Sequence, residues 1–140
     1  MVPFKLLTLD HVVLRIADLD RSLAFYVDVL GCSIEKRQEE LGLIQLRAGA
    51  SLIDLVPLAG KLGREGGAGP KAEGRNVDHF AIEIDPFDEA KIRAHLEDHG
   101  IAIGEIARRY GAKGFGQSIY IEDPDGNSVE LKGPPESSSR

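Results

Sequence analysis

The chain repeats its own opening pattern about half-way along its 140 residues. The segment Asp10-His-Val-Val-Leu-Arg-Ile16 aligns with Asp78-His-Phe-Ala-Ile-Glu-Ile84, so that a histidine recurs 68 positions later, at 11 and at 79. Such a repeat is typical of duplicated structural units, because one unit alone cannot bury its apolar face. We therefore predict two modules in a single domain over residues 7–132, and the paired histidines become the first functional candidates.

The first module, residues 7–57, has the pattern of a strand, a helix and three further strands. Its opening strand is almost continuously apolar, which is typical of a strand covered on both faces. Asp18 is a candidate N-cap, and Gly31 ends the helical spacing that begins at Leu19. The strands predicted in this module are 8–16, 33–37, 43–47 and 51–56.

The second module, residues 76–132, is expected to have the same order. We predict a helix that begins at Asp85-Pro86 and runs through His99, with a strand at 101–106 after it. Residues 118–131 indicate two strands joined by a hairpin turn, since Asp123-Pro-Asp-Gly-Asn127 supplies turn residues. The remaining predictions are a glycine-rich loop at 107–117, a flexible linker or lid at 58–75 and a disordered tail at 133–140.

These elements predict an α+β fold of two tandem βαβββ modules. The modules are expected to form a curved mixed sheet around a concave metal site, with one helix per module outside. A net charge of −6 without a basic stripe argues against nucleic acid as a partner. No apolar run is long enough for a membrane span, and the single cysteine, Cys32, fits a reducing cytoplasm.

Each module carries one histidine on its first strand and one carboxylate on its last, His11 with Asp54 and His79 with Glu130. By strand parity these four side chains point to the concave face, provided that the helices cover the other face. Two imidazoles and a carboxylate with open positions suit iron(II), nickel, cobalt, manganese or zinc. The alternative for either histidine alone is a hydrogen-bonded core residue.

Other polar residues are predicted near this face. Tyr120 is a proton donor or a cavity wall, and Gln45 lines the same cavity. Arg108, Arg109 and Lys113 are expected to anchor an anionic substrate, unless they belong to an ordinary solvated loop.

A further expectation concerns two charges at equivalent positions of the repeat. Arg15 and Glu83 each lie four residues beyond the histidine of their module, so both are expected on the concave face. An unpaired charge there is costly. We therefore expect an ion pair between them.

Four segments resemble the vicinal oxygen chelate superfamily, which includes glyoxalases, bleomycin-resistance proteins and extradiol dioxygenases. They are Leu9-Asp-His-Val-Val-Leu14, Ser22-Leu-Ala-Phe-Tyr-Val-Asp-Val-Leu-Gly31, Val77-Asp-His-Phe-Ala-Ile82 and Asp123-Pro-Asp-Gly-Asn-Ser-Val-Glu-Leu131. Tyr110-Gly-Ala-Lys-Gly114 with Ser118-Ile-Tyr120 is similar to the branch called glyoxalase domain-containing protein 5. The resemblance covers residues 7–132.

The resemblance implies a divalent metal that takes substrate oxygens directly, with His11, His79 and Glu130 as ligands. Asp54 stands where glyoxalase I has a glutamate that acts as ligand and base, so it is either a fourth ligand or a free base. The implied function is a metal-dependent lyase or isomerase, acting on a small oxygenated substrate chelated through vicinal oxygens. A homodimer is also expected, with the cavity built within one chain or between two.

Two alternatives remain open. An iron(II) extradiol-type dioxygenase would use the same three ligands, although the histidine expected six to eight residues before Ile119 is absent. A metal-free binding protein of the bleomycin-sequestering kind would lack the ligand set that is present here. The substrate and the metal are not specified by the sequence.

Overall fold

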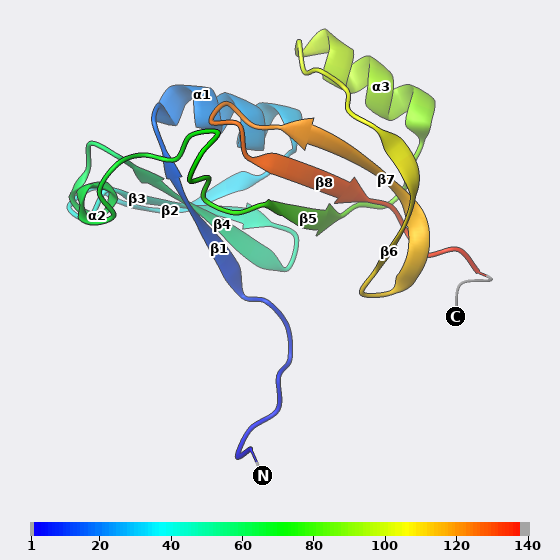
Figure 1. Cartoon of the computed structure of the whole chain (residues 1–140), viewed down its shortest axis with the longest axis horizontal. Helices are drawn as coiled ribbons and strands as arrows, with labels where there is room; N and C mark the ends of the chain where they lie inside the picture. Colours follow the sequence, from blue (N-terminus) through cyan, green and yellow to red (C-terminus); the bar gives the residue numbers. More distant parts are fainter. Residues whose placement is uncertain (1, 138–140) are drawn as a thin grey trace. The chain divides into compact units, whose positions relative to one another are not determined.

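The computed structural model describes residues 2–137 of the chain. It divides into two compact units, residues 1–70 and 71–140, and the boundary falls inside the predicted linker. Each unit contains one four-stranded sheet with the same strand arrangement (Figure 1). The predicted fold of two tandem βαβββ modules is confirmed.

Unit 1 forms a sheet in the order β1-β4-β3-β2, in which β1 and β4 run parallel and the other neighbours antiparallel. Its helix is a short α-helix that continues directly as a π-helix. The elements are β1 (His11–Ile16), α1 (Leu19–Leu23), η1 (Ala24–Val29), β2 (Ser33–Gln38), β3 (Leu43–Ala48) and β4 (Ser51–Pro57).

Unit 2 repeats this topology with the order β5-β8-β7-β6, and again the first and last strands run parallel. The first and last strands of each module therefore become neighbours, although about 40 to 50 residues separate them in the chain. The elements are β5 (His79–Glu83), α3 (Glu89–Asp98), β6 (Ile106–Gly111), β7 (Gly114–Glu122) and β8 (Ser128–Lys132).

Both helices begin at an aspartate and stop near a glycine. The Asp18 carboxylate accepts a hydrogen bond from the Arg21 amide at 3.0 Å, as predicted. In unit 2 the N-cap is Asp88, which accepts from the Lys91 amide at 3.1 Å, so α3 starts later than the predicted Asp85-Pro86. Gly31 adopts a φ of 86°, a left-handed conformation that suits the residue after a helix.

The core of each unit is built from alternate strand positions. On β1, Leu14 and Ile16 are fully buried, whereas His11 and Arg15 occupy the opposite face. The apolar side chains of the helices complete the two cores. The buried apolar residues include Phe25, Tyr26, Leu46, Ile53 and Leu55 in unit 1, and Leu96, Ile119, Ile121, Val129 and Leu131 in unit 2.

The prediction for residues 101–117 was wrong. Residues 101–105 have no regular structure, and β6 begins only at Ile106. The segment 107–117, predicted as a loop, is the hairpin of β6 and β7, paired from Ile106 with Ile119 to Gly111 with Gly114. The glycines of this segment hide the alternation that is typical of a strand. The strands form nevertheless, because the pairing of β6 with β7 and of β7 with β8 outweighs weak local propensity.

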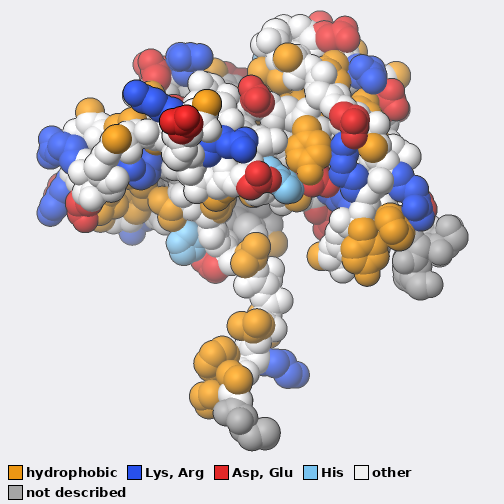
Figure 2. Space-filling view, in the orientation of Figure 1, with side chains coloured by type: hydrophobic (Ala, Val, Ile, Leu, Met, Phe, Trp, Pro, Cys, Tyr) orange, Lys and Arg blue, Asp and Glu red, His pale blue; other side chains and the backbone are white. Residues whose placement is uncertain are grey.

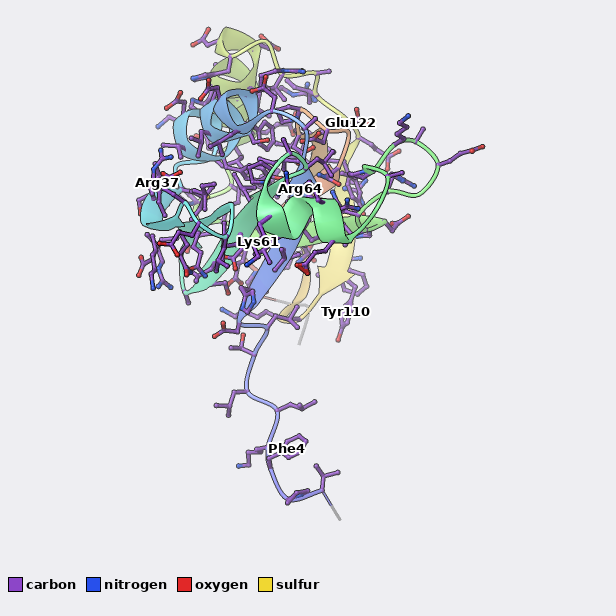
Figure 3. The ribbon with its side chains drawn as sticks, turned by 90° about the vertical axis from the view of Figure 1, so that its left-hand side faces the viewer. Phe4, Arg37, Lys61, Arg64, Tyr110 and Glu122 are labelled. Atoms are coloured by element: carbon purple, nitrogen blue, oxygen red, sulfur yellow. The ribbon has the colours of Figure 1, made fainter. Side chains whose placement is uncertain are left out.

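The predicted linker contains a short helix, α2 (Lys61–Glu65), on which Lys61 and Arg64 are labelled in Figure 3. The Arg15 guanidinium holds this helix and the segment that follows it. It donates to the carbonyls of Gly63, Gly66, Gly67 and Ala68 at 2.6–3.1 Å.

Arg15 therefore has partners within its own unit. Glu83 also has a partner within its own unit, because its carboxylate forms an ion pair with Lys113 at 3.1 Å. The reason for the predicted pair between Arg15 and Glu83 disappears, since neither charge is left without a partner.

The C-terminal segment is more ordered than predicted. The Gly133 amide donates to the Gln117 carbonyl and the Glu136 amide to the Phe115 carbonyl, so this segment runs beside β7. The Glu136 carboxylate also pairs with Arg108 at 2.8 Å. The rest of the predicted disordered tail, residues 138–140, lies outside the described residues.

Candidate metal centre

In unit 1, neighbouring strands place a histidine and a carboxylate on one face of the sheet. His11 opens β1, and Asp54 lies on β4 opposite Val13, which shares the His11 face. The Nε2 atom of His11 is 4.0 Å from Oδ2 of Asp54. Gln45, directly across from Asp54 on β3, donates from Nε2 to the same oxygen at 3.2 Å. The predicted sharing of one face is therefore borne out for these three residues.

Asp54 is buried, and its second carboxylate oxygen has no partner among the residues that the structure describes. The residue is 3% exposed, and Oδ1 makes no hydrogen bond with any residue that the structure describes. A buried carboxylate oxygen without a donor is costly unless a cation or a proton meets it. This oxygen suits either a metal ion or a proton taken from a substrate.

Unit 2 repeats the arrangement with a longer carboxylate. His79 opens β5, Glu130 lies on β8, and the distance from His79 Nε2 to Glu130 Oε1 is 3.6 Å. Tyr120 lies directly across from Glu130 on β7, the position that Gln45 holds in unit 1. The Tyr120 hydroxyl is 3.4 Å from Nε2 of His79, so hydroxyl, imidazole and carboxylate converge at one point.

The aspartate before each histidine orients its ring. Asp10 Oδ2 lies 2.8 Å from Nδ1 of His11, and Asp78 Oδ2 lies 2.7 Å from Nδ1 of His79. A carboxylate that accepts from Nδ1–H leaves Nε2 as the basic nitrogen, and this is how metal-binding histidines are usually held. The sequence analysis gave Asp10 and Asp78 no role, although the repeated Asp-His dipeptide was the available signal.

Hydrogen bonds, burial and nearby charges shift the pKa values of several of these groups. The hydrogen bond that His11 donates to Asp10, followed by the charge of Asp54, raises the pKa of His11 above 6.5. The hydrogen bond from His79 lowers the pKa of Asp78, which keeps that carboxylate ionised. Burial, followed by the charge of Glu130, raises the pKa of the Tyr120 hydroxyl, so this group keeps its proton at neutral pH.

In each unit, one histidine and one carboxylate are close enough to bind the same divalent ion, and we call each such pair a half-site. Two ligand atoms each about 2.1 Å from one ion lie no more than about 4.2 Å apart. The separations of 4.0 Å and 3.6 Å fall within that limit. Among residues 2–137, no group of three or more candidate ligand side chains gathers within reach of one ion. Each unit by itself therefore supplies one imidazole and one carboxylate.

The three predicted anchors for an anionic substrate have different surroundings. Arg109 lies with its guanidinium 4.5 Å from the Tyr120 ring centre and donates to Ser118 and Glu105. Arg108, one residue earlier, lies on the other face of β6, where it stacks on Phe115 at 3.8 Å and pairs with Glu136. Of the three residues, only Arg109 contacts Tyr120, the side chain beside His79 and Glu130 in unit 2.

Lys113 lies at the turn of the same hairpin and pairs with Glu83.

Two further observations concern the chain as a whole. Cys32 is buried, which raises the pKa of its thiol. None of the helices within residues 2–137 has the length and apolar character that crossing a membrane requires. The cytoplasmic location stays a prediction.

Comparisons with known proteins identify relatives of this chain. The model of the glyoxalase/bleomycin resistance protein/dioxygenase superfamily matches residues 8–131. The chain is 31% identical to a catechol-2,3-dioxygenase of Bacillus subtilis, over 88% of this chain but 40% of that protein. It is 30% identical to a lactoylglutathione lyase of Haemophilus influenzae, over 86% of this chain and 88% of that protein.

A solved structure shares the fold of this chain. An integron cassette protein of V. cholerae has a TM-score of 0.74 and 32% identity, over 94% of this chain and 98% of that one. Sequence and fold therefore agree over nearly the whole chain. The protein belongs to the glyoxalase/bleomycin resistance protein/dioxygenase superfamily.

Proposed function

We propose that this protein is a metal-dependent lyase or isomerase of the glyoxalase type, acting on a small substrate that carries two neighbouring oxygens. His11, His79 and Glu130 are the proposed ligands of one divalent ion. The metal would supply a Lewis acid for the substrate oxygens. The roles of this chain's own side chains follow from their surroundings in the two half-sites.

The observation that carries the proposal is the duplicated triplet of aspartate, histidine and buried carboxylate. In both units an aspartate holds Nδ1 while Nε2 faces a carboxylate from the last strand. Packing alone does not require such a triplet on either sheet, and its occurrence in both units supports a role in binding a metal. The family relationship supports the same interpretation.

Asp54 is the proposed general base. Its Oδ1 is buried and without a donor among the described residues, so it can accept a proton from a substrate carbon or hydroxyl. Gln45 holds the other oxygen and thereby keeps the carboxylate in one orientation. The side chain is one methylene shorter than glutamate, which favours proton transfer over direct metal binding.

Tyr120 is the proposed proton donor. Its hydroxyl lies beside His79 Nε2, and its raised pKa keeps the proton on the oxygen until a substrate oxygen accepts it. Arg109 stacks against the ring and limits its movement. An anionic group on the substrate would find Arg109 the nearest of the predicted cations, because its guanidinium touches the Tyr120 ring.

The test is the metal content of protein purified without a histidine tag, compared with three variants and one control. His11→Ala, His79→Ala and Glu130→Ala are each expected to abolish stoichiometric metal. His95→Ala, on the exposed side of α3, should retain it. Full occupancy in either histidine variant would disprove the ligand set. Loss confined to the variants of one unit would mean that its half-site binds metal alone.

A second candidate activity is extradiol-type ring cleavage with iron(II). The similarity to the Bacillus subtilis catechol-2,3-dioxygenase favours it, although the chain spans only 40% of that protein. Bound iron together with oxygen consumption in the presence of catechol would support this candidate. Nickel, cobalt or zinc without oxygen consumption would support the lyase or isomerase.

A further inference from the structure

The N-terminal segment, residues 2–8, is apolar and unpartnered. Figure 1 shows it leading outward from the start of β1, and Figure 2 shows apolar side chains along its length. The large apolar side chains of residues 2–9 have exposed fractions of 67% to 89%; they are Val2, Phe4, Leu6, Leu7 and Leu9. An exposed apolar stretch of this size is typical of an interaction element.

The backbone of this segment is also unpaired. The first hydrogen bonds of the chain involve the Leu9 carbonyl, which accepts from Ser51, and the Asp10 carbonyl, which accepts from the Leu52 amide. Residues 2–8 make no hydrogen bond or ion pair with any other residue in the range 2–137. A segment with free amides, free carbonyls and apolar side chains has what an added strand needs.

The same chain offers a matching edge. β6 is the last strand in the order β5-β8-β7-β6, so its outer edge has no strand partner among the described residues. Tyr110 on β6 is 71% exposed and stands away from the hairpin (Figure 3). Its ring packs edge-on against Phe115 at 5.0 Å, which makes an aromatic surface beside the free edge.

The dimensions and the pattern of the two elements agree. Seven extended residues span about 23 Å, and six strand residues about 20 Å. In a strand, Val2, Phe4 and Leu6 would share one face, as Ile106, Arg108 and Tyr110 do on β6. Pro3 lacks an amide proton, which is tolerated where that side of the strand faces solvent, as at the new edge of an enlarged sheet.

We propose that residues 2–8 of one molecule add as a fifth strand to the outer edge of β6 in a second copy of this chain. Every copy of the chain carries both the donor segment and the acceptor edge. A two-fold dimer satisfies both at once, because each copy gives its segment to the other. Val2, Phe4 and Leu6 then pack over Tyr110 and Phe115.

The first test compares molar mass by light scattering for the full chain and a variant that lacks residues 2–8. The full chain is expected at twice its 15.2 kDa mass and the shortened variant at the monomer mass. Phe4→Asp with Leu6→Asp should also give monomers, whereas Ile34→Asp on the exposed strand β2 should remain dimeric. A shortened variant that stays dimeric, or a full chain that is monomeric, would overturn the proposal.

The second test locates the segment on its partner. Leu6→Cys and Tyr110→Cys proteins, both carrying Cys32→Ser, are mixed under mild oxidation and analysed for disulfide-linked heterodimers. Leu6→Cys mixed with Ile34→Cys is the control, since both sites are exposed and β2 is also an edge strand. Cross-linking several-fold above the control is expected. Equal yields would refute the assignment to β6.

Discussion

Replacing Arg15 with methionine should release residues 63–68 from β1. The guanidinium donates to the Gly67 and Gly63 carbonyls at 2.6 Å and 2.7 Å, and to those of Gly66 and Ala68 at 3.1 Å. Methionine keeps much of the aliphatic stem but has no donor. The change therefore isolates the hydrogen bonds from the packing.

The size of the effect follows from the surroundings of each bond. Only the bond to Gly63 is partly buried, and a charge-assisted bond there contributes about 1.5–3 kcal/mol. The other three carbonyls are exposed and regain water when the guanidinium is removed, so each loses only about 0.5 kcal/mol. The rotamer entropy that arginine loses on being held offsets up to about 2 kcal/mol. We expect a net loss of about 2 kcal/mol.

Urea unfolding and amide hydrogen exchange measure the global and the local effect. Exchange should increase at the amides of Leu62 and Arg64, which donate to the Leu41 and Gly60 carbonyls in the native state. Arg93→Met is the control, because Arg93 makes an exposed i,i+4 pair with Glu89 worth no more than about 0.5 kcal/mol. If Arg15→Met matches this control in both measurements, Arg15 does not hold the segment.

Three further predictions concern the half-site and the core. Asp54→Asn should lower turnover at least 100-fold, because the proposed base loses its charge. The metal content of this variant should fall less than that of Glu130→Ala. Unchanged turnover would exclude Asp54 as the base. In metal-free protein, Asp10→Asn should bring the pKa of His11 down towards 6.5, as followed by NMR titration. The raised pKa of His11 contributes stability below pH 6.5 that is lost as the pH rises through the folded-state value; an unshifted titration would show that Asp10 is not its main cause. Leu96→Ala, at a side chain 1% exposed on α3, should destabilise by about 2–5 kcal/mol in urea unfolding, against less than about 1 kcal/mol for the exposed Val13→Ala.

Strand parity made the shared faces of the candidate site residues readable from the sequence. Side chains alternate between the faces of a strand, so the shared face of His11, Asp54 and Gln45 follows once the strands are located. The same reasoning places His79, Glu130 and Tyr120 together. The repeat indicated that the two modules have the same elements in the same sequence, whereas the order of the strands in each sheet came from the structure.

The sequence by itself determined the duplicated fold and the pairing of histidine with carboxylate in each module, since both depend on local periodicity and on the repeat. Only the tertiary structure decided that Asp10 and Asp78 hold the rings, that Arg15 binds carbonyls within and just after α2, and that residues 106–122 form a hairpin. Those outcomes depend on side-chain rotamers and on strand pairing. Local residue preferences leave several such arrangements close in energy, and long-range packing selects among them.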